Sequence, residues 1–77
     1  RRRALVKQMH HRLEEARVAV RNIRRDIHND IRDYEKEKLI TEDDRLFGEE
    51  ELQKVTDKFI EDIARHGQVK EKEIMEV

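Results

Sequence analysis

Apolar residues recur at a helical spacing through the first half of the chain. They stand at Leu5, Met9, Leu13, Ala16, Val20, Ile23, Ile27, Ile31 and Tyr34. Eight steps of three or four residues give a period of about 3.6, that of an unstrained α-helix, whereas a left-handed coiled coil needs about 3.5. No Pro or Gly interrupts residues 1–47. The pattern therefore predicts a long helix over about residues 1–39, with its apolar stripe facing a bundle core.

A second helix is predicted from about residue 42 to residue 75. Thr41 suits its N-cap, because the hydroxyl can accept from the Asp44 amide, and Asp44 gives an approximate capping box. Gly48 and Gly67 are candidate kinks or frayed sites. A connection this short makes the two helices antiparallel neighbours. The apolar stripe of this helix is weaker and consists of Leu52, Val55, Phe59, Ile60, Ile63, Ile74 and Met75.

Two helices with one shared seam make a thin core for a chain of 77 residues. The first helix carries more apolar surface than one partner needs, since Val6, Val18 and Ala19 flank its stripe. We therefore expect an all-α fold in which residues 1–77 form part of a helical bundle, with a third helix supplied by an absent part of the chain or by another protein. The alternative is an antiparallel dimer of the hairpin, which would give four helices.

The near-neutral charge of −1 hides a strong asymmetry. Residues 1–25 hold nine basic and two acidic side chains, while residues 26–77 hold nine basic and seventeen acidic ones. The chain contains no Cys, which excludes a disulfide scaffold and a Cys-based zinc site. It also has no apolar run of about 18 residues, as a transmembrane helix requires. The basic first half points instead to a polyanionic partner.

Basic residues gather along one edge of the first helix. With Arg17 set to zero on a helical wheel, they fall within an arc of roughly 100°, separate from the apolar stripe at roughly 240° to 320°. This arginine stripe consists of Arg17, Arg21, Arg24, Arg25, His28 and Arg32, and Arg3, Lys7 and His10 extend it toward the N-terminus. Like charges at i,i+4 disfavour a helix, so helix stability does not explain the pattern.

Guanidinium groups bind phosphates bidentately, so an Arg at nearly every turn suits the backbone of structured nucleic acid. No aromatic residues interleave with the stripe, which disfavours a stacking platform for single strands. We expect recognition of shape and backbone rather than of base sequence. Spacing alone leaves three interpretations open: a nucleic-acid partner, an acidic protein partner, or a solvated face.

Several segments resemble the ribosome recycling factor family. The most specific is ARVAVRNIRRD at residues 16–26, which resembles the signature of that family's second long helix. The match continues with ITEDD at 40–44, LQKVTDKFI at 52–60 and KEKEIM at 70–75. Two residues depart from the family pattern: Gly67 stands where relatives usually carry an apolar residue, and His66 replaces a small one. Both should weaken the seam of the second helix.

The resemblance implies a protein of two domains, a three-helix bundle and a small β-rich domain inserted after the first helix. This chain corresponds to the last two bundle helices only. The family acts in the bacterial cytoplasm and in organelles, where it separates ribosomal subunits after translation termination together with elongation factor G and GTP. We expect the bacterial cytoplasm here, with an organellar form left open.

By the same resemblance, the bundle binds 23S-type ribosomal RNA of the large subunit through the arginines of the VRNIRR motif. These correspond to Arg21, Arg24 and Arg25, with Arg17 one turn earlier. The expected RNA-binding set is completed by His28, Arg32, Arg3 and Lys7 from the helical wheel. Elongation factor G and ribosomal proteins are the further expected partners, and neither DNA nor a membrane is expected.

Catalysis and metal binding are not expected from these residues. The chain has no Ser or Cys nucleophile, and its carboxylates fall on solvated faces where nothing would raise their pKa values. His10 and Glu14 share a helix face, but two ligands do not make a metal site. We expect no enzyme activity and no cofactor. The alternative function is a helical hairpin that pairs with an acidic or helical protein.

Overall fold

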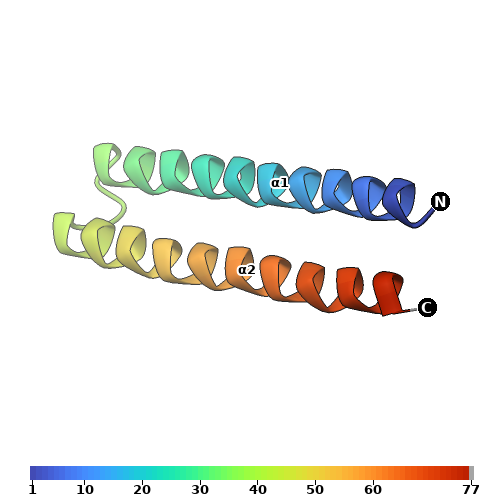
Figure 1. The fold of residues 1–77 in the computed structure, drawn as a ribbon. Helices are drawn as coiled ribbons and strands as arrows, with labels where there is room; N and C mark the ends of the chain where they lie inside the picture. Colours follow the sequence, from blue (N-terminus) through green and yellow to red (C-terminus); the bar gives the residue numbers. More distant parts are fainter. Residues whose placement is uncertain (77) are drawn as a thin grey trace.

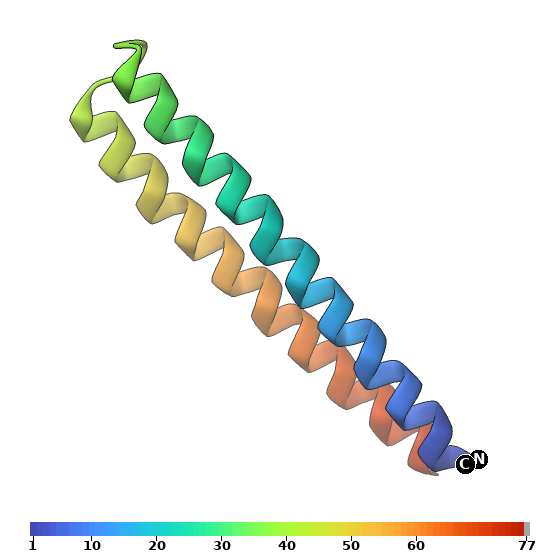
Figure 2. The same ribbon diagram turned by 90° about the horizontal axis from the view of Figure 1, so that it is seen from above.

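The computed structural model describes residues 1–76 as two antiparallel helices. Helix α1 spans Arg2–Lys36 and helix α2 spans Glu42–Glu76, and the two pack side by side along their whole length (Figure 1). The Cα atoms extend 57 Å along the long axis and 15 Å and 9 Å across it. The first residues of α1 and the last residues of α2 lie at the same end of this rod (Figure 2). The all-α prediction of two long, packed helices is confirmed.

Helix α1 ends earlier than the pattern predicted, at Lys36 rather than near Lys38 or Leu39. Lys38 adopts a left-handed backbone conformation with φ of 62°. Its amide donates to the Glu35 carbonyl and the Leu39 amide donates to the Tyr34 carbonyl, both at 2.9 Å. These two bonds form a Schellman motif with lysine at the position that glycine usually takes. Apolar periodicity could not reveal this ending, because no glycine marks it.

Helix α2 begins with the predicted capping box. The Asp44 amide donates to the Thr41 hydroxyl at 3.1 Å, and the Thr41 amide donates to an Asp44 carboxylate oxygen at 3.1 Å. Glu42, Asp43 and Asp44 place negative charge in the first turn, where the helix dipole favours it. The boundary at residue 42 follows from this local chemistry.

The two glycines lie at the seam and do not kink α2, contrary to the expectation of a kink or fray. Gly67 is buried, and a Cβ built there would overlap the Leu13 Cδ1 methyl. At Gly48 a Cβ would lie 3.4 Å from Ile31 Cδ1. The absent side chain at Gly67 therefore lets the two helices approach closely. The expectation that this residue weakens the seam stays a prediction, while the structure shows Leu13 packed against the position that a side chain would take.

Packing covers only part of the apolar stripe of α1. The half-buried residues of α1 fall between roughly 260° and 20° on the same wheel, an arc centred near 320°. The apolar stripe is centred near 280°, so its outer side stays uncovered. Ile23 is 59% exposed and Phe59 of α2 is 56% exposed, although both were expected in the core. Among residues 1–76, no apolar side chain counts as buried.

Candidate nucleic-acid interface

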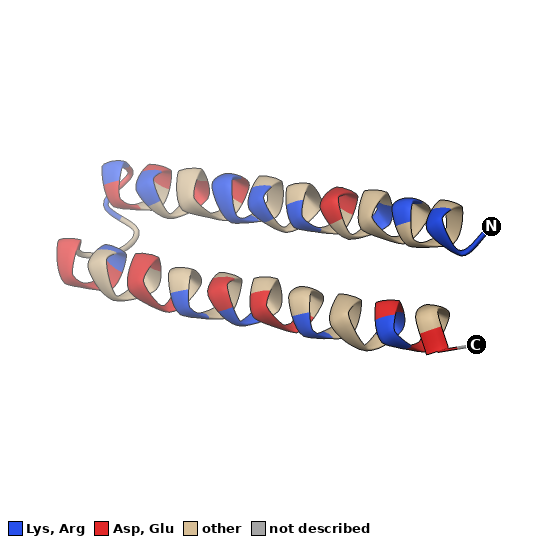
Figure 3. Cartoon of the chain, in the orientation of Figure 1, with Lys and Arg blue, Asp and Glu red and all other residues tan. Residues whose placement is uncertain are grey.

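The arginine stripe runs from the edge of the seam onto the open surface of α1. Arg21, Arg25 and Arg32 are exposed, whereas Arg17, Arg24 and His28 are half-buried beside α2. Coloured by charge, basic segments recur along α1 and acidic ones are more frequent on α2 (Figure 3). The stripe is continuous because α1 has no break over residues 2–36 and keeps one helical phase.

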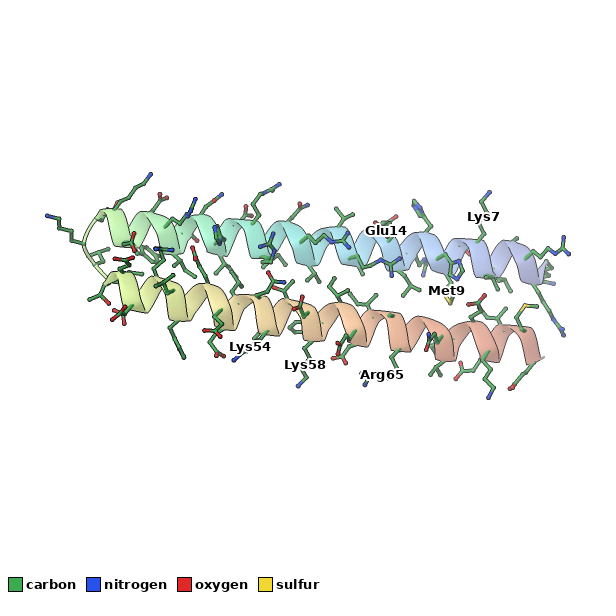
Figure 4. The ribbon with its side chains drawn as sticks, turned by 60° about the vertical axis from the view of Figure 1, so that its left-hand side comes forward. Lys7, Met9, Glu14, Lys54, Lys58 and Arg65 are labelled. Atoms are coloured by element: carbon green, nitrogen blue, oxygen red, sulfur yellow. The ribbon has the colours of Figure 1, made fainter. Side chains whose placement is uncertain are left out.

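Arg3 and Lys7 extend this edge toward the N-terminus and are both exposed. Figure 4 shows Lys7 pointing away from α2 and Met9 pointing toward it. Their opposite directions follow from a separation of two positions, which is about 200° on a helix. Arg3 and Lys7 line a shallow hollow together with Glu71 of α2, so acidic charge is close at this end.

One carboxylate on α1 accompanies the first two arginines of the stripe. Glu14 accepts a hydrogen bond from Arg17 Nε at 2.9 Å and lies 3.9 Å from Arg21 Nη1. Such exposed pairs contribute roughly 0–1 kcal/mol and are screened by salt. A phosphate could therefore replace Glu14 at these guanidinium groups without a large loss of folding stability.

The middle of the stripe has the fewest acidic neighbours. Within the described chain, no carboxylate lies at ion-pair distance from Arg24, and Arg25 has only the adjacent Asp26 at 3.7 Å. The side chain of Arg24 lines an apolar groove, so its stem is partly covered while its charge stays unpaired. Such a group is available to an external anion.

The C-terminal end of the stripe is tied to α2. His28 Nδ1 lies 3.7 Å and Arg32 Nε 3.8 Å from the same oxygen, Glu49 Oε1. The other oxygen of Glu49 accepts from Arg45 Nη1 at 3.1 Å, and Arg45 also donates to Glu35 of α1. The hydrogen bond to Glu35 raises the pKa of the Arg45 guanidinium. These contacts link the two helices at the hairpin end and place the positive charges of Arg32 and Arg45 beside Glu49.

An apolar groove runs between the helices on the uncovered side of the seam. Its wall on α1 is formed by Val20, Ile23 and Ile27, and its wall on α2 by Leu52, Val55 and Phe59. Thr56 lies at its floor, where the hydroxyl donates to the Leu52 carbonyl at 2.7 Å, so this polar group is satisfied. A contiguous apolar surface of this kind is typical of a site that another element covers.

Three of the histidines in residues 1–76 lie at ion-pair distance from nearby carboxylates. Over residues 1–76, no three His, Cys, Asp or Glu side chains come close enough to hold a metal ion. His10 lies 3.5 Å from Glu71 of α2 and His11 lies 2.7 Å from Glu15, while Glu14 pairs with Arg17. Neither helix, over the described residues, has an apolar stretch long enough to cross a membrane.

Comparison with known proteins decides the family. A sequence model described as "Ribosome recycling factor" matches residues 1–75. The chain belongs to the ribosome recycling factor family. The resemblance of the ARVAVRNIRRD segment is thereby confirmed.

Individual relatives support the same conclusion over the whole chain. The ribosome-recycling factors of Syntrophomonas wolfei, Halalkalibacterium halodurans and Symbiobacterium thermophilum are 57%, 52% and 51% identical to it over 77 residues. These matches cover 100% of this chain and 42% of each relative. The chain thus spans about two fifths of the length of these ribosome-recycling factors.

Sequence reasoning missed Glu49, the residue of α2 that contacts the stripe. The helical wheel places residues on one helix only and cannot say which residue of the other helix lies opposite them. The short turn over residues 37–41 fixes the register of α1 against α2. The length of this turn is the sequence signal that could have placed residues 45–49 opposite residues 28–32. The stripe was predicted correctly as a helix edge, but its contact with α2 was not.

Proposed function

We propose that the arginine stripe binds ribosomal RNA of the large subunit. The observation that carries the proposal is the middle of the stripe, where Arg24 and Arg25 present guanidinium groups with few competing carboxylates on a continuous helix. Membership of the family supports the ribosome as the target. Phosphate contacts of this kind fix position and orientation without reading base sequence.

In this proposal the chain keeps the factor in a fixed position and orientation on the RNA and catalyses no reaction of its own. A straight helical rod anchored at several phosphates resists rotation on the RNA. Elongation factor G, driven by GTP hydrolysis, would push on the bound factor and so separate the subunits after termination, in the bacterial cytoplasm. The free energy for separation then comes from elongation factor G, and these residues supply the anchor.

We further propose that a third helix of the same protein covers the apolar groove, completing a three-helix bundle in a longer chain. The support is the offset of about 40° between the apolar stripe and the arc that α2 covers, together with the exposed Ile23 and Phe59. The relatives have more than twice the length of this chain, which leaves room for such a helix.

A salt titration of the full-length protein on isolated large subunits tests the RNA-binding proposal. Several phosphate contacts should give a log–log plot of affinity against salt with a slope of about −0.7 to −0.9 per contact, hence roughly −3 or steeper for four or more contacts. A slope near zero would contradict the proposal. It would favour instead a hairpin that binds a helical protein through its apolar groove.

A further inference from the structure

Glu49 occupies an unusual place, since two arginines and one histidine approach its one carboxylate. Arg45 comes from its own helix, and His28 and Arg32 come from the arginine stripe of α1. The Glu49 side chain is only 22% exposed, whereas that of Arg32 is 62% exposed. The carboxylate thus lies at the seam between the helices and contacts the stripe from the side of α2. The side of Arg32 that faces away from α2 stays exposed to solvent.

The two oxygens of Glu49 differ in how they are satisfied. Oε2 accepts a hydrogen bond from Arg45 at 3.1 Å, while Oε1 is buried and has no hydrogen-bond partner. His28 Nδ1 and Arg32 Nε lie just beyond hydrogen-bond distance from this oxygen, at 3.7 and 3.8 Å. An unsatisfied buried carboxylate oxygen is unfavourable, so it attracts both side chains toward the seam.

We propose that Glu49 is a positioning residue that restrains RNA binding at the C-terminal end of the arginine stripe. It holds Arg32 and His28 toward α2 and offsets the charge of Arg32, so that these two groups engage phosphate less than Arg21, Arg24 and Arg25 do. The stripe then has a strongly binding middle and a weakened end. This inference rests on the proposed RNA-binding function.

The ion pairs around Glu49 indicate that it restrains Arg32 and is not required to hold the two helices together. Arg45 keeps a second partner, because it also donates to Glu35, so the hairpin end stays linked if Glu49 loses its charge. Arg32 has no ion-pair partner besides Glu49 within the described chain. Neutralising Glu49 therefore releases the charge of Arg32 while Arg45 keeps its bond across the seam.

The test compares Glu49→Gln with Glu50→Gln in the full-length protein on isolated large subunits. Both variants remove one negative charge from α2, but Glu50 is exposed and does not contact the stripe. We expect Glu49→Gln to raise affinity about three- to ten-fold at low salt and to steepen the salt slope by about one unit. Glu50→Gln should change affinity less than two-fold and leave the slope unchanged.

Two further measurements show whether Glu49 acts through Arg32 or only through its charge. In an Arg32→Ala background, Glu49→Gln should lose most of its effect, because the released group is gone. In the free protein, nitrogen relaxation of the Arg32 Nε–H group should show greater mobility in Glu49→Gln and not in Glu50→Gln. Equal effects of the two variants, or a lower affinity of Glu49→Gln with unchanged helicity, would overturn the proposal.

Failure of the RNA-binding function itself would look different. In that case the unsubstituted protein would show a flat salt slope, whatever residue stands at position 49. A steep slope in the unsubstituted protein combined with no difference between Glu49→Gln and Glu50→Gln would refute the role of Glu49 alone.

Discussion

On one flank of the seam lie apolar side chains of both helices, and on the other flank lie guanidinium groups of α1. The groove is formed by residues such as Ile23 and Phe59, and the open side of the stripe by Arg21 and Arg25. On α1 the two flanks are separated by the arc that α2 covers, so one helix presents two chemically different faces. In the proposals above, a third helix covers the apolar face and RNA phosphates contact the basic face.

The difference between the flanks teaches which residues serve folding and which serve binding. Apolar surface is stabilising only when it leaves water, so the groove should matter for stability in the longer protein. Exposed guanidinium groups contribute little to stability, so the stripe should matter for affinity. Arg24 belongs to both sets of residues, because it is part of the stripe on the helical wheel and its side chain lines the groove.

The largest effect is expected from a charge placed in the groove. Phe59→Asp should destabilise the full-length protein by about 3 kcal/mol or more, because a buried ring is lost and a carboxylate is buried. In the isolated 77-residue chain the same change should stay within about 0.5 kcal/mol, since Phe59 is 56% exposed there. Denaturant unfolding of both proteins measures the difference.

An equal loss of stability in the two proteins would contradict the proposal that a third helix covers the groove. If a second copy of the hairpin covers it instead, unfolding of the 77-residue chain should depend on protein concentration, and Phe59→Asp should abolish that dependence.

A smaller effect is expected on the basic flank. The double variant Arg21→Ala with Arg25→Ala should lower affinity for the large subunit about 30- to 100-fold, since each lost phosphate contact is worth roughly 1–1.4 kcal/mol. Neither residue lines the groove, so the free energy of unfolding should stay within about 0.5 kcal/mol. Filter binding or fluorescence anisotropy measures the affinity.

Helix α2 supplies a matched control for this prediction. Lys54 and Lys58 point away from α1 on its outer face (Figure 4). Lys54 lies 3.4 Å from Glu51, so its charge is partly offset. Lys54→Ala with Lys58→Ala removes the same formal charge and should weaken binding less than three-fold. A loss as large as that of the arginine variant would mean that net charge, and not the stripe, sets affinity.

At the seam between the two flanks, two glycine substitutions are expected to change stability in opposite directions. Gly67→Leu should destabilise the full-length protein by about 1–3 kcal/mol, because the added side chain overlaps Leu13. Gly48→Ala should instead be neutral or stabilise by up to about 1 kcal/mol, since its Cβ would have room and alanine favours the helix. Thermal unfolding distinguishes the signs; a neutral Gly67→Leu would contradict the close approach of the helices.

Much of the fold follows from local chemistry in the sequence. The period of the apolar stripe predicted α1, and the pair Thr41 and Asp44 predicted where α2 begins. Lys38 was not predictable as a helix end, because the left-handed conformation is marked by glycine in most chains. Gly67 was misread for a related reason: its meaning depends on Leu13, which is distant in sequence.

In the candidate site, too, the features set by one helix could be predicted and those set by the packing of both helices could not. The phase of α1 predicted which basic residues share an edge, since that depends on one helix alone. The register between the helices decides that Glu49 faces Arg32 and that Arg24 borders the groove, and this depends on packing of the two helices. A helical wheel contains no information on that packing.

The most direct test of the central claim is a cryo-electron microscopy map of the full-length protein on the large ribosomal subunit. The account predicts that the edge of α1 carrying Arg21, Arg24 and Arg25 lies along the RNA backbone, with their guanidinium groups at hydrogen-bond distance from phosphate oxygens. A map in which this edge faces solvent while another surface of the protein contacts the subunit would contradict it.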